Sequence, residues 1–150
     1  MTSPFNFIYS RMPEKLDGAI EAKIREQFPR YPFPAFLGIK IEELDFGHAR
    51  LSLPIKDELT QGMGYIHGGA ITSLCDTSVA AAIFTMLDDD EQILTIELKI
   101  NFLAPAAGDI YAQAKILHKG RKTAVGEVDV SDLSGALIAK ALVTYYISKD

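Results

Sequence analysis

The chain has little of three things: cysteine, basic charge and long apolar runs. A single cysteine among 150 residues excludes an intramolecular disulfide framework, which favours the cytoplasm as the compartment. Lysine and arginine number 15 against 20 aspartates and glutamates, which gives a net charge of -5. This balance provides no overall basic field, so we expect neither nucleic acid nor an anionic lipid surface as a partner.

No segment is apolar enough to predict a transmembrane helix. The weakly charged stretch 67–87 is near the ~20 residues that span a bilayer. However, it contains Asp76 near its middle, several serines and threonines, and Gly68 and Gly69 close to its start. Residues 1–10 include apolar side chains but no preceding basic residue, so they are not predicted to be a signal peptide. The sequence therefore predicts a cytoplasmic protein that has no membrane partner.

The chain does have enough apolar residues, 48%, to bury the core of one domain at this length. The spacing of these residues predicts an amphipathic helix over 13–28. An extended connector is predicted over 29–34, where three prolines fall. Alternation of apolar and polar residues predicts strands over 49–55, 94–102, 110–116, 124–130 and 137–147, with a weaker strand or irregular segment over 36–44.

These elements predict an α+β fold with an antiparallel sheet. The connections between the last four strands are too short for parallel crossovers and long enough for hairpins. The stretch 67–87 is predicted to be a helix that the sheet wraps, because apolar or small residues occupy all of its faces. The predicted division is an N-terminal helical extension over 1–35 and one domain over 36–150.

Asp76 is the most informative residue of this central stretch. From 67 to 87 it is the only acidic or basic side chain apart from His67. A lone carboxylate in apolar surroundings is costly unless it is paired or used in chemistry. Asp76 is therefore a candidate catalytic residue, and the alternative is a buried carboxylate that is hydrogen-bonded to Ser73, Thr77 or a facing helix.

Several other sequence patterns do not match a dinucleotide-binding, metal-binding or cysteine-nucleophile site. The run from Gly62 to His67 lacks the third glycine of a dinucleotide-binding fingerprint, and the histidines are not spaced as metal ligands. The acidic run 88–91 lacks the spacing of a calcium loop and is expected to be solvated. Cys75 has no activating base in sequence, so we expect a buried structural thiol. No metal or cofactor is predicted.

Gly68 supplies a second chemical group if the helix begins there. Its backbone N–H would be an unpaired donor at the positive end of the helix, where a developing oxyanion can bind. Asp76 lies nine residues after His67, ~13 Å away along the helix axis and on another side. Since one chain cannot easily bring both to one small reacting group, the geometry predicts a site shared by two copies of the chain.

A combination of motifs resembles the hotdog-fold acyl-CoA thioesterases of the phenylacetate-pathway (PaaI-like) type. The matching residues are Gln61, Gly64, His67-Gly68-Gly69, Asp76 and Thr77, followed by the runs 95–105 and 120–139. The resemblance covers roughly 36–147 in order. It implies a single hotdog domain, in which a curved antiparallel sheet surrounds one long helix. It also implies a homodimer or a dimer of dimers that hydrolyses the thioester of an acyl- or aryl-acyl-CoA.

The resemblance implies a role for each matching residue. Asp76 would be the general base or the nucleophile, and the Gly68 N–H would polarise the thioester carbonyl. The catalytic group would also include three further residues. His67 would shape the loop and contact substrate, Thr95 would position water or the carboxylate, and Gln61 would stand in the loop before His67. The implied substrate and coenzyme A contacts are Gly69, Thr77, Arg121 and Lys122.

Alternatives remain from the same residues. A non-enzymatic acyl-CoA binding or sensing protein would keep the pocket and the basic turn at 119–122 without turnover. A hotdog dehydratase would need a different arrangement of bases, and an acyl carrier protein could take the place of coenzyme A. Short-chain, medium-chain and aryl substrates are all open, with Tyr31, Phe33, Tyr65 and Phe84 as candidate pocket residues.

Overall fold

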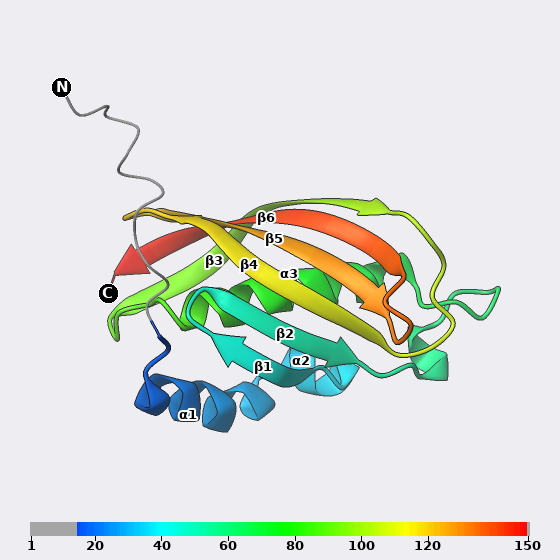
Figure 1. The fold of residues 1–150 in the computed structure, drawn as a ribbon, viewed down its shortest axis with the longest axis horizontal. Helices are drawn as coiled ribbons and strands as arrows, with labels where there is room; N and C mark the ends of the chain where they lie inside the picture. Colours follow the sequence, from blue (N-terminus) through cyan, green and yellow to red (C-terminus); the bar gives the residue numbers. More distant parts are fainter. Residues whose placement is uncertain (1–14, 150) are drawn as a thin grey trace.

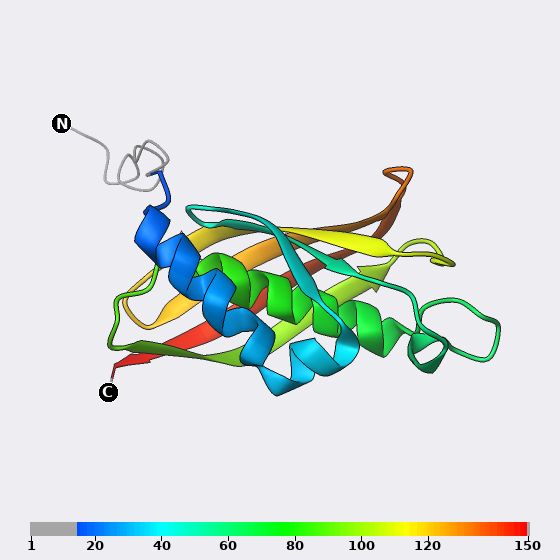
Figure 2. The same ribbon diagram turned by 90° about the horizontal axis from the view of Figure 1, so that it is seen from below.

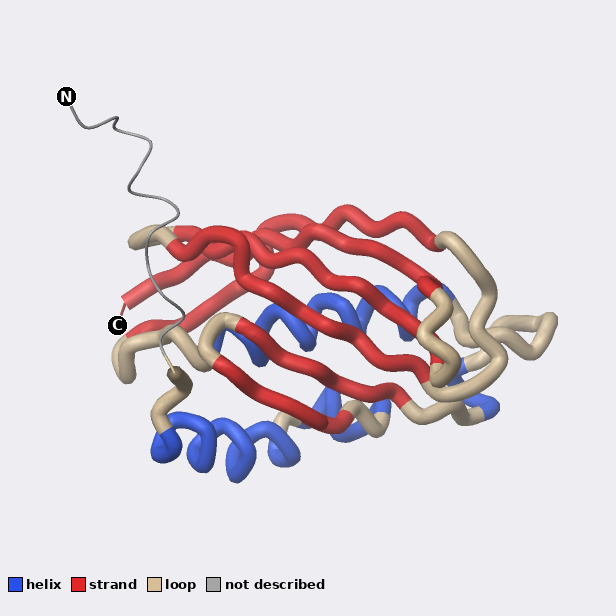
Figure 3. Tube along the Cα trace, in the orientation of Figure 1, coloured by secondary structure: helices blue, strands red, loops and turns tan. Residues whose placement is uncertain are grey.

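The computed structural model describes residues 15–149. Six antiparallel strands form one sheet in the order β1-β2-β4-β5-β6-β3, which curves around helix α3 (Figures 1 and 3). The strands are β1 (Lys40–Asp45), β2 (His48–Leu53), β3 (Glu91–Phe102), β4 (Ile110–Lys119), β5 (Thr123–Asp132) and β6 (Leu137–Lys149). The predicted α+β fold, a curved antiparallel sheet around one long helix, is confirmed.

The alternation of side chains in each strand sets the register of the sheet. In β5 and β6, Val128 pairs with Ala141 and Val130 with Ala139, and all four side chains are buried. A one-residue slip would turn these side chains outward, so the buried face fixes the pairing. The register between β3 and β6 shifts after Thr95, between Thr95 and Glu97. This irregularity lies next to the candidate site.

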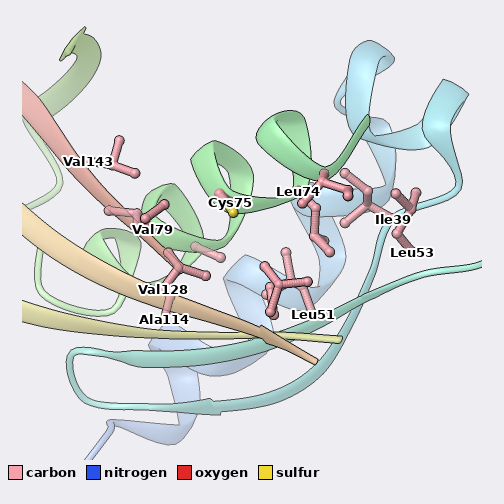
Figure 4. Close-up of a cluster of buried hydrophobic side chains, with 14 of the residues drawn as sticks. Ile39, Leu51, Leu53, Leu74, Cys75, Val79, Ala114, Val128 and Val143 are labelled. Atoms are coloured by element: carbon pink, nitrogen blue, oxygen red, sulfur yellow. The ribbon is translucent and has the colours of Figure 1, made fainter. Parts of the chain in front are cut away.

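Helix α3 (Gly68–Phe84) fills the inside of the curved sheet. Its inward side packs on β2, β4 and β5, and the buried side chains of this cluster are shown in Figure 4. Burying each large aliphatic side chain contributes about 1.5–3 kcal/mol. Gly126 of β5 allows the close approach, because a Cβ there would lie 2.8 Å from the Val79 side chain.

The N-terminal segment differs from the prediction in two places. Helix α1 (Gly18–Gln27) begins later than residue 13, because the Asp17 side chain accepts hydrogen bonds from the backbone N–H groups of Ala19 and Ile20. Part of the predicted first turn lies outside the described residues. The predicted extended connector over 29–34 is wrong, since a 3-10 helix, η2 (Phe28–Arg30), and helix α2 (Pro32–Leu37) occupy it.

Proline position explains the second difference. Both η2 and α2 carry proline within their first two positions, where no intrahelical N–H is needed and the fixed φ suits a helix. Gly38, at φ +81°, then ends α2 in the left-handed conformation. Figure 2 shows α1 and α2 on the side that the sheet leaves open. Between them and α3, the centres of the Tyr31 and Phe84 rings lie 6.1 Å apart.

The acidic run 88–91 is only partly the solvated loop that was expected. Asp88, Asp89 and Asp90 are exposed, but Glu91 begins β3 and its side chain is only 4% exposed. Its carboxylate lies 3.1 Å from the Nζ atom of Lys119, which compensates the charge. The solvated-loop expectation is therefore wrong for Glu91.

Within residues 15–149, none of the helices combines the length and apolar character required to cross a membrane. The prediction that residues 1–10 are not a signal peptide falls outside the described part of the chain.

Candidate functional site

Helix α3 presents one incompletely buried side that carries most of its polar residues. This open stripe of α3 consists of Thr72, Ser73, Asp76, Thr77 and Ala80, which are half-buried and recur at helical spacing. The opposite side carries Leu74, Cys75 and Val79, which are fully buried against the sheet. The edge strand β3 lies beside the stripe, since Thr95 of β3 contacts Asp76.

Asp76 is held by two hydroxyl groups that come from neighbouring strands. The Oγ1 atom of Thr95 donates a hydrogen bond to Asp76 Oδ1 at 3.0 Å, and the Tyr145 hydroxyl donates to the same oxygen at 2.7 Å. Thr95 and Tyr145 are direct partners in the β3–β6 register, so both side chains reach α3 from the same place. Thr95 therefore takes the predicted position beside the candidate carboxylate.

Tyr145 is a site residue that the sequence analysis missed. Its ring is buried, and its hydroxyl lies 2.8 Å from the main-chain oxygen of Asp76 as well as 2.7 Å from Oδ1. Burial and the neighbouring Asp76 charge raise the pKa of the phenol far above its usual value, although a hydrogen bond with Thr95 opposes them. Tyr145 therefore stays protonated and remains a donor. One sequence signal was present: a tyrosine on the buried face of a strand needs a partner for its hydroxyl.

Among the polar groups of α3, the second carboxylate oxygen of Asp76, Oδ2, and the backbone N–H of Gly68 have no hydrogen-bond partner within the described chain. The neighbouring N–H of Gly69 is occupied, because it donates to His67 Nδ1 at 2.8 Å. His67 thus caps the helix, and the first free donor of α3 is Gly68.

These two free groups lie far apart within one chain. Helix α3 begins at Gly68, as the glycine pair predicted, and Asp76 lies eight residues further on. At 1.5 Å per residue, this separation is ~12 Å along the axis. Neither of two hollows of about 780 Å³ and 570 Å³ on the described chain is lined by Asp76 or Gly68.

Gln61 and His67 stabilise the loop before α3. The Gln61 side chain accepts a hydrogen bond from the Met63 N–H, and its main-chain groups bond to Tyr65 and Gly64 at 2.8 Å each. This loop is exposed over 62–65. The hydrogen bonds of Gln61 therefore stabilise the loop and do not reach Asp76 in this chain. The catalytic role of Gln61 stays a prediction.

The expected coenzyme A residues lie at two separate places. Thr77 is half-buried on the open stripe next to Asp76, and Gly69 lies in the first turn of α3. Arg121 and Lys122 are exposed in the turn between β4 and β5, where the Lys122 carbonyl accepts a hydrogen bond from the Ile147 N–H. The roles of all four residues in binding stay predictions.

Cys75 has the character expected of a structural thiol. It is fully buried against the sheet, as Figure 4 shows. Burial, with a smaller contribution from the Asp76 charge, raises the pKa of the thiol to about 12. Because the thiolate is the nucleophilic form, Cys75 is inert at neutral pH. Among residues 15–149, no three histidine, cysteine, aspartate or glutamate side chains gather as a metal site.

Comparison with known proteins places this chain in a family. Residues 63–139 match the thioesterase superfamily. A candidate esterase of Saccharolobus solfataricus is 40% identical over 113 residues, which are 75% of this chain and 80% of that protein. The 1,4-dihydroxy-2-naphthoyl-CoA hydrolase of Listeria monocytogenes is 28% identical over 114 residues, 75% of this chain and 93% of that protein.

A solved structure gives the same fold. The PaaI protein of the Escherichia coli phenylacetic acid degradation operon superposes with a TM-score of 0.79 at 22% identity, and covers 87% of this chain and 94% of that one. This confirms the hotdog fold that the sequence motifs implied. The match over 63–139 includes Gly68, Asp76 and Thr95 of the candidate site. The chain belongs to the thioesterase superfamily and is a thioester hydrolase.

Proposed function

We propose that the chain hydrolyses an acyl- or aryl-acyl-CoA thioester to the free acid and coenzyme A. Asp76 acts as general base or nucleophile, and the Gly68 N–H polarises the thioester carbonyl. The observation that carries this proposal is the state of Asp76, whose carboxylate is fixed at Oδ1 by Thr95 and Tyr145 while Oδ2 has no partner within the described chain. A fixed carboxylate with one free oxygen suits proton abstraction or direct attack.

The proposed site is completed by a second copy of the chain. A two-fold axis beside α3 would set two α3 helices side by side in opposite directions. The start of one helix would then lie near the middle of the other, which brings Gly68 of one copy to Asp76 of its partner. The ~12 Å between these groups in one chain supports this arrangement, since the site is incomplete without it.

Strand β3 supports the same axis. It is the last strand of the sheet on the side where Thr95 meets Asp76, so its outer edge has no neighbouring strand within the described chain. Leu94, Ile96 and Phe102 on this strand are each more than half exposed. An apolar unpaired edge favours association with another strand. Pairing of β3 with its copy would continue the sheet and cover these side chains.

The basic turn between β4 and β5 is the proposed contact for the nucleotide end of coenzyme A. Arg121 and Lys122 are exposed there, and guanidinium and ammonium groups bind phosphates by charge-assisted hydrogen bonds. Coenzyme A is favoured over a carrier protein because the Listeria relative is named as a CoA hydrolase.

The proposal is tested by release of coenzyme A from a panel of thioesters. Short-chain, medium-chain and aryl-acyl-CoA substrates are each incubated with the purified chain, and the free thiol is measured. Asp76→Asn is expected to lower kcat by ~10²–10⁴-fold, the usual contribution of a general base. The matched control is Asp57→Asn, an exposed aspartate in the 3-10 helix η3 (Asp57–Leu59), which is expected to keep wild-type turnover.

Two results would contradict this assignment. If every member of the panel bound without thiol release, the chain would be a CoA binder instead of a hydrolase. If Asp76→Asn turned over within twofold of the wild type, Asp76 would have no part in the reaction.

A further inference from the structure

Three hydrogen-bond contacts surround Asp76, but the two hydroxyl groups that make them have only two hydrogens. The Tyr145 hydroxyl has a single hydrogen, but two acceptors lie within reach: Asp76 Oδ1 at 2.7 Å and the Asp76 main-chain oxygen at 2.8 Å. Thr95 Oγ1 also donates to Oδ1, at 3.0 Å. The hydroxyl of Tyr145 therefore has two alternative positions, and neither of them occupies Oδ2.

We propose that Tyr145 is a positioning residue with two donor states, which makes Oδ2 of Asp76 the reacting oxygen. When Asp76 is ionised, the Tyr145 hydroxyl donates to Oδ1. When Asp76 is protonated, the hydroxyl turns to the main-chain oxygen of the same residue. The inference rests on the proposed function and adds to it the identity of the reacting atom.

The ionised state explains how the carboxylate is oriented. Hydrogen bonds to a charged acceptor are roughly twice as strong as neutral ones, so both Thr95 and Tyr145 favour Oδ1 when it shares the negative charge. Two donors on one oxygen fix the rotation of the carboxylate. The second oxygen then keeps its lone pairs for water or for the thioester carbon.

The protonated state explains why the second acceptor matters. A neutral carboxyl group attracts the phenol less, and Tyr145 is 4% exposed, so water does not readily replace the lost bond. A buried donor that is left without a partner costs about 1–3 kcal/mol. The main-chain oxygen of Asp76, which α3 holds in place, provides an acceptor at 2.8 Å and avoids this cost.

Both routes of hydrolysis use Oδ2 in this scheme. In the base route, water gives a proton to Oδ2 while its oxygen bonds to the thioester carbon. The C–S bond then breaks, and the proton on Oδ2 passes to the coenzyme A thiolate. In the nucleophile route, Oδ2 itself bonds to the carbon and coenzyme A leaves as the thiolate. Water then adds its hydroxyl to the acyl carbon of the resulting anhydride, the bond from that carbon to Oδ2 breaks, and the Asp76 carboxylate and the free acid result. The other proton of the water passes to the coenzyme A thiolate.

The test is Tyr145→Phe, which removes only the hydroxyl and keeps the buried ring. We expect kcat to fall by ~10–100-fold, since loose orientation of a reacting group typically costs this order. KM is expected to stay within about threefold, because Tyr145 is argued to act through Asp76 and not on the substrate. The matched control is Tyr146→Phe, which removes the hydroxyl of the next residue, a more exposed tyrosine, and is expected to change neither constant.

Each outcome bears on the inference. If the unsubstituted chain releases coenzyme A and Tyr145→Phe keeps kcat within twofold, the inference is overturned while the proposed function stands. A rise in KM with unchanged kcat would also overturn it, because that result indicates a substrate contact. If the unsubstituted chain releases no coenzyme A from any thioester, the proposed function fails and takes the inference with it. A thermal melt of each variant separates loss of fold from loss of rate.

Discussion

Cys75 and Asp76 are adjacent, yet the structure gives them opposite environments. Cys75 lies at the side of α3 that packs on the sheet and is fully buried, whereas Asp76 lies on the half-buried open stripe. A rotation of about 100° per residue separates the two. The carboxylate also lies close enough to help raise the pKa of the thiol. Asp76 is therefore on the accessible side of α3, as its proposed role requires, and Cys75 is not.

We expect the Cys75 thiol to be unreactive in the folded protein. Since its pKa is about 12, the thiol is neutral at pH 8, and only the thiolate reacts quickly with alkylating or disulfide reagents. Labelling is measured at pH 8 with and without urea, and only the unfolded chain should react. Cys75→Ala should keep kcat within about twofold, because no step uses the sulfur. Rapid labelling of the folded chain, or loss of turnover in this variant, would show that the thiol has a functional role.

Tyr145 shows which part of the candidate site could be predicted from the sequence and which part could not. Its place in the alternation of 137–147 predicted an inward side chain, and that prediction was confirmed. Its partner was not predictable, because Thr95 and Asp76 lie 50 and 69 residues away in the chain and meet only through the β3–β6 register and the packing of α3. Only the polar hydroxyl on an apolar face signalled that a partner must exist.

At the scale of the elements, the start of β3 contains Glu91, an acidic residue outside the candidate site whose side chain is only 4% exposed. The Glu91 carboxylate accepts from the Asp88 N–H at 3.0 Å, from Lys119 at 3.1 Å, and lies 4.0 Å from Lys149. The hydrogen bond from Asp88 is the main cause that lowers the pKa of Glu91, and the lysines add to it against the effect of burial. This cluster joins the start of β3 to the ends of β4 and β6.

The lowered pKa of Glu91 gives a stability prediction with a definite sign. A carboxylate with a lowered folded pKa stabilises the fold above its unfolded pKa, about 4.3, and loses this contribution as pH falls through the folded value. Glu91→Gln should therefore lower the free energy of unfolding by about 1–3 kcal/mol at pH 7. The difference from wild type should shrink below pH ~4, where the wild-type carboxylate is also protonated.

Urea denaturation at a series of pH values measures this difference. The control is Glu58→Gln, because Glu58 is exposed in η3 and should change stability little at any pH. A Glu91→Gln difference that is constant from pH 7 to pH 3 would mean that the ionised carboxylate does not stabilise the start of β3.

Element types were predictable from the sequence wherever a regular pattern ran long enough. Strands β3 to β6 are each ten or more residues long, and the alternation over 94–102, 110–116, 124–130 and 137–147 predicted a strand at each of them. Hairpins join β4 to β5 and β5 to β6, but the hairpin that the short connection 103–109 allowed does not form, because β3 pairs with β6 and β4 pairs with β2 and β5. Helix α2 was not predicted, because its six residues include two prolines and are too few to show a helical period. Proline is favourable at the start of a helix and is also common in extended connectors. Composition alone therefore could not distinguish a short helix from a connector in this segment.

At the scale of the whole molecule, the proposed site depends on a second copy. The sequence alone showed that Gly68 and Asp76 were too far apart along one helix, and the described chain keeps them separated. The surface through which we propose that the two copies meet was not predictable from the sequence. The exposure of Leu94, Ile96 and Phe102 could be recognised only when the structure showed that β3 is an edge strand. The N-terminal extension proposed over 1–35 includes α1, which contacts the body through the ion pair of Lys23 with Asp89 at 2.8 Å.

Gly68→Pro removes the backbone N–H of residue 68 and adds a proline ring. Gly68 is the first residue of α3, a position where proline is favourable, and the preceding His67 has φ -65° and ψ +138°, which suits a residue before proline. A Cβ at position 68 would lie 3.1 Å from the Phe102 ring, so Gly68→Ala is the matched control that adds this contact and keeps the N–H. The two variants together isolate the donor.

The shared site is tested most directly by mixing subunits. Gly68→Pro and Asp76→Asn chains carrying different tags are co-expressed, and the mixed dimers are purified. If each site takes Gly68 from one chain and Asp76 from the other, one site of the mixed dimer carries both changes and the other carries neither. The account predicts that each parent is inactive and that the mixed dimer regains about half of wild-type turnover. Mixed dimers no more active than their parents, with Gly68→Ala still active, would show that Asp76 and Gly68 act within one chain.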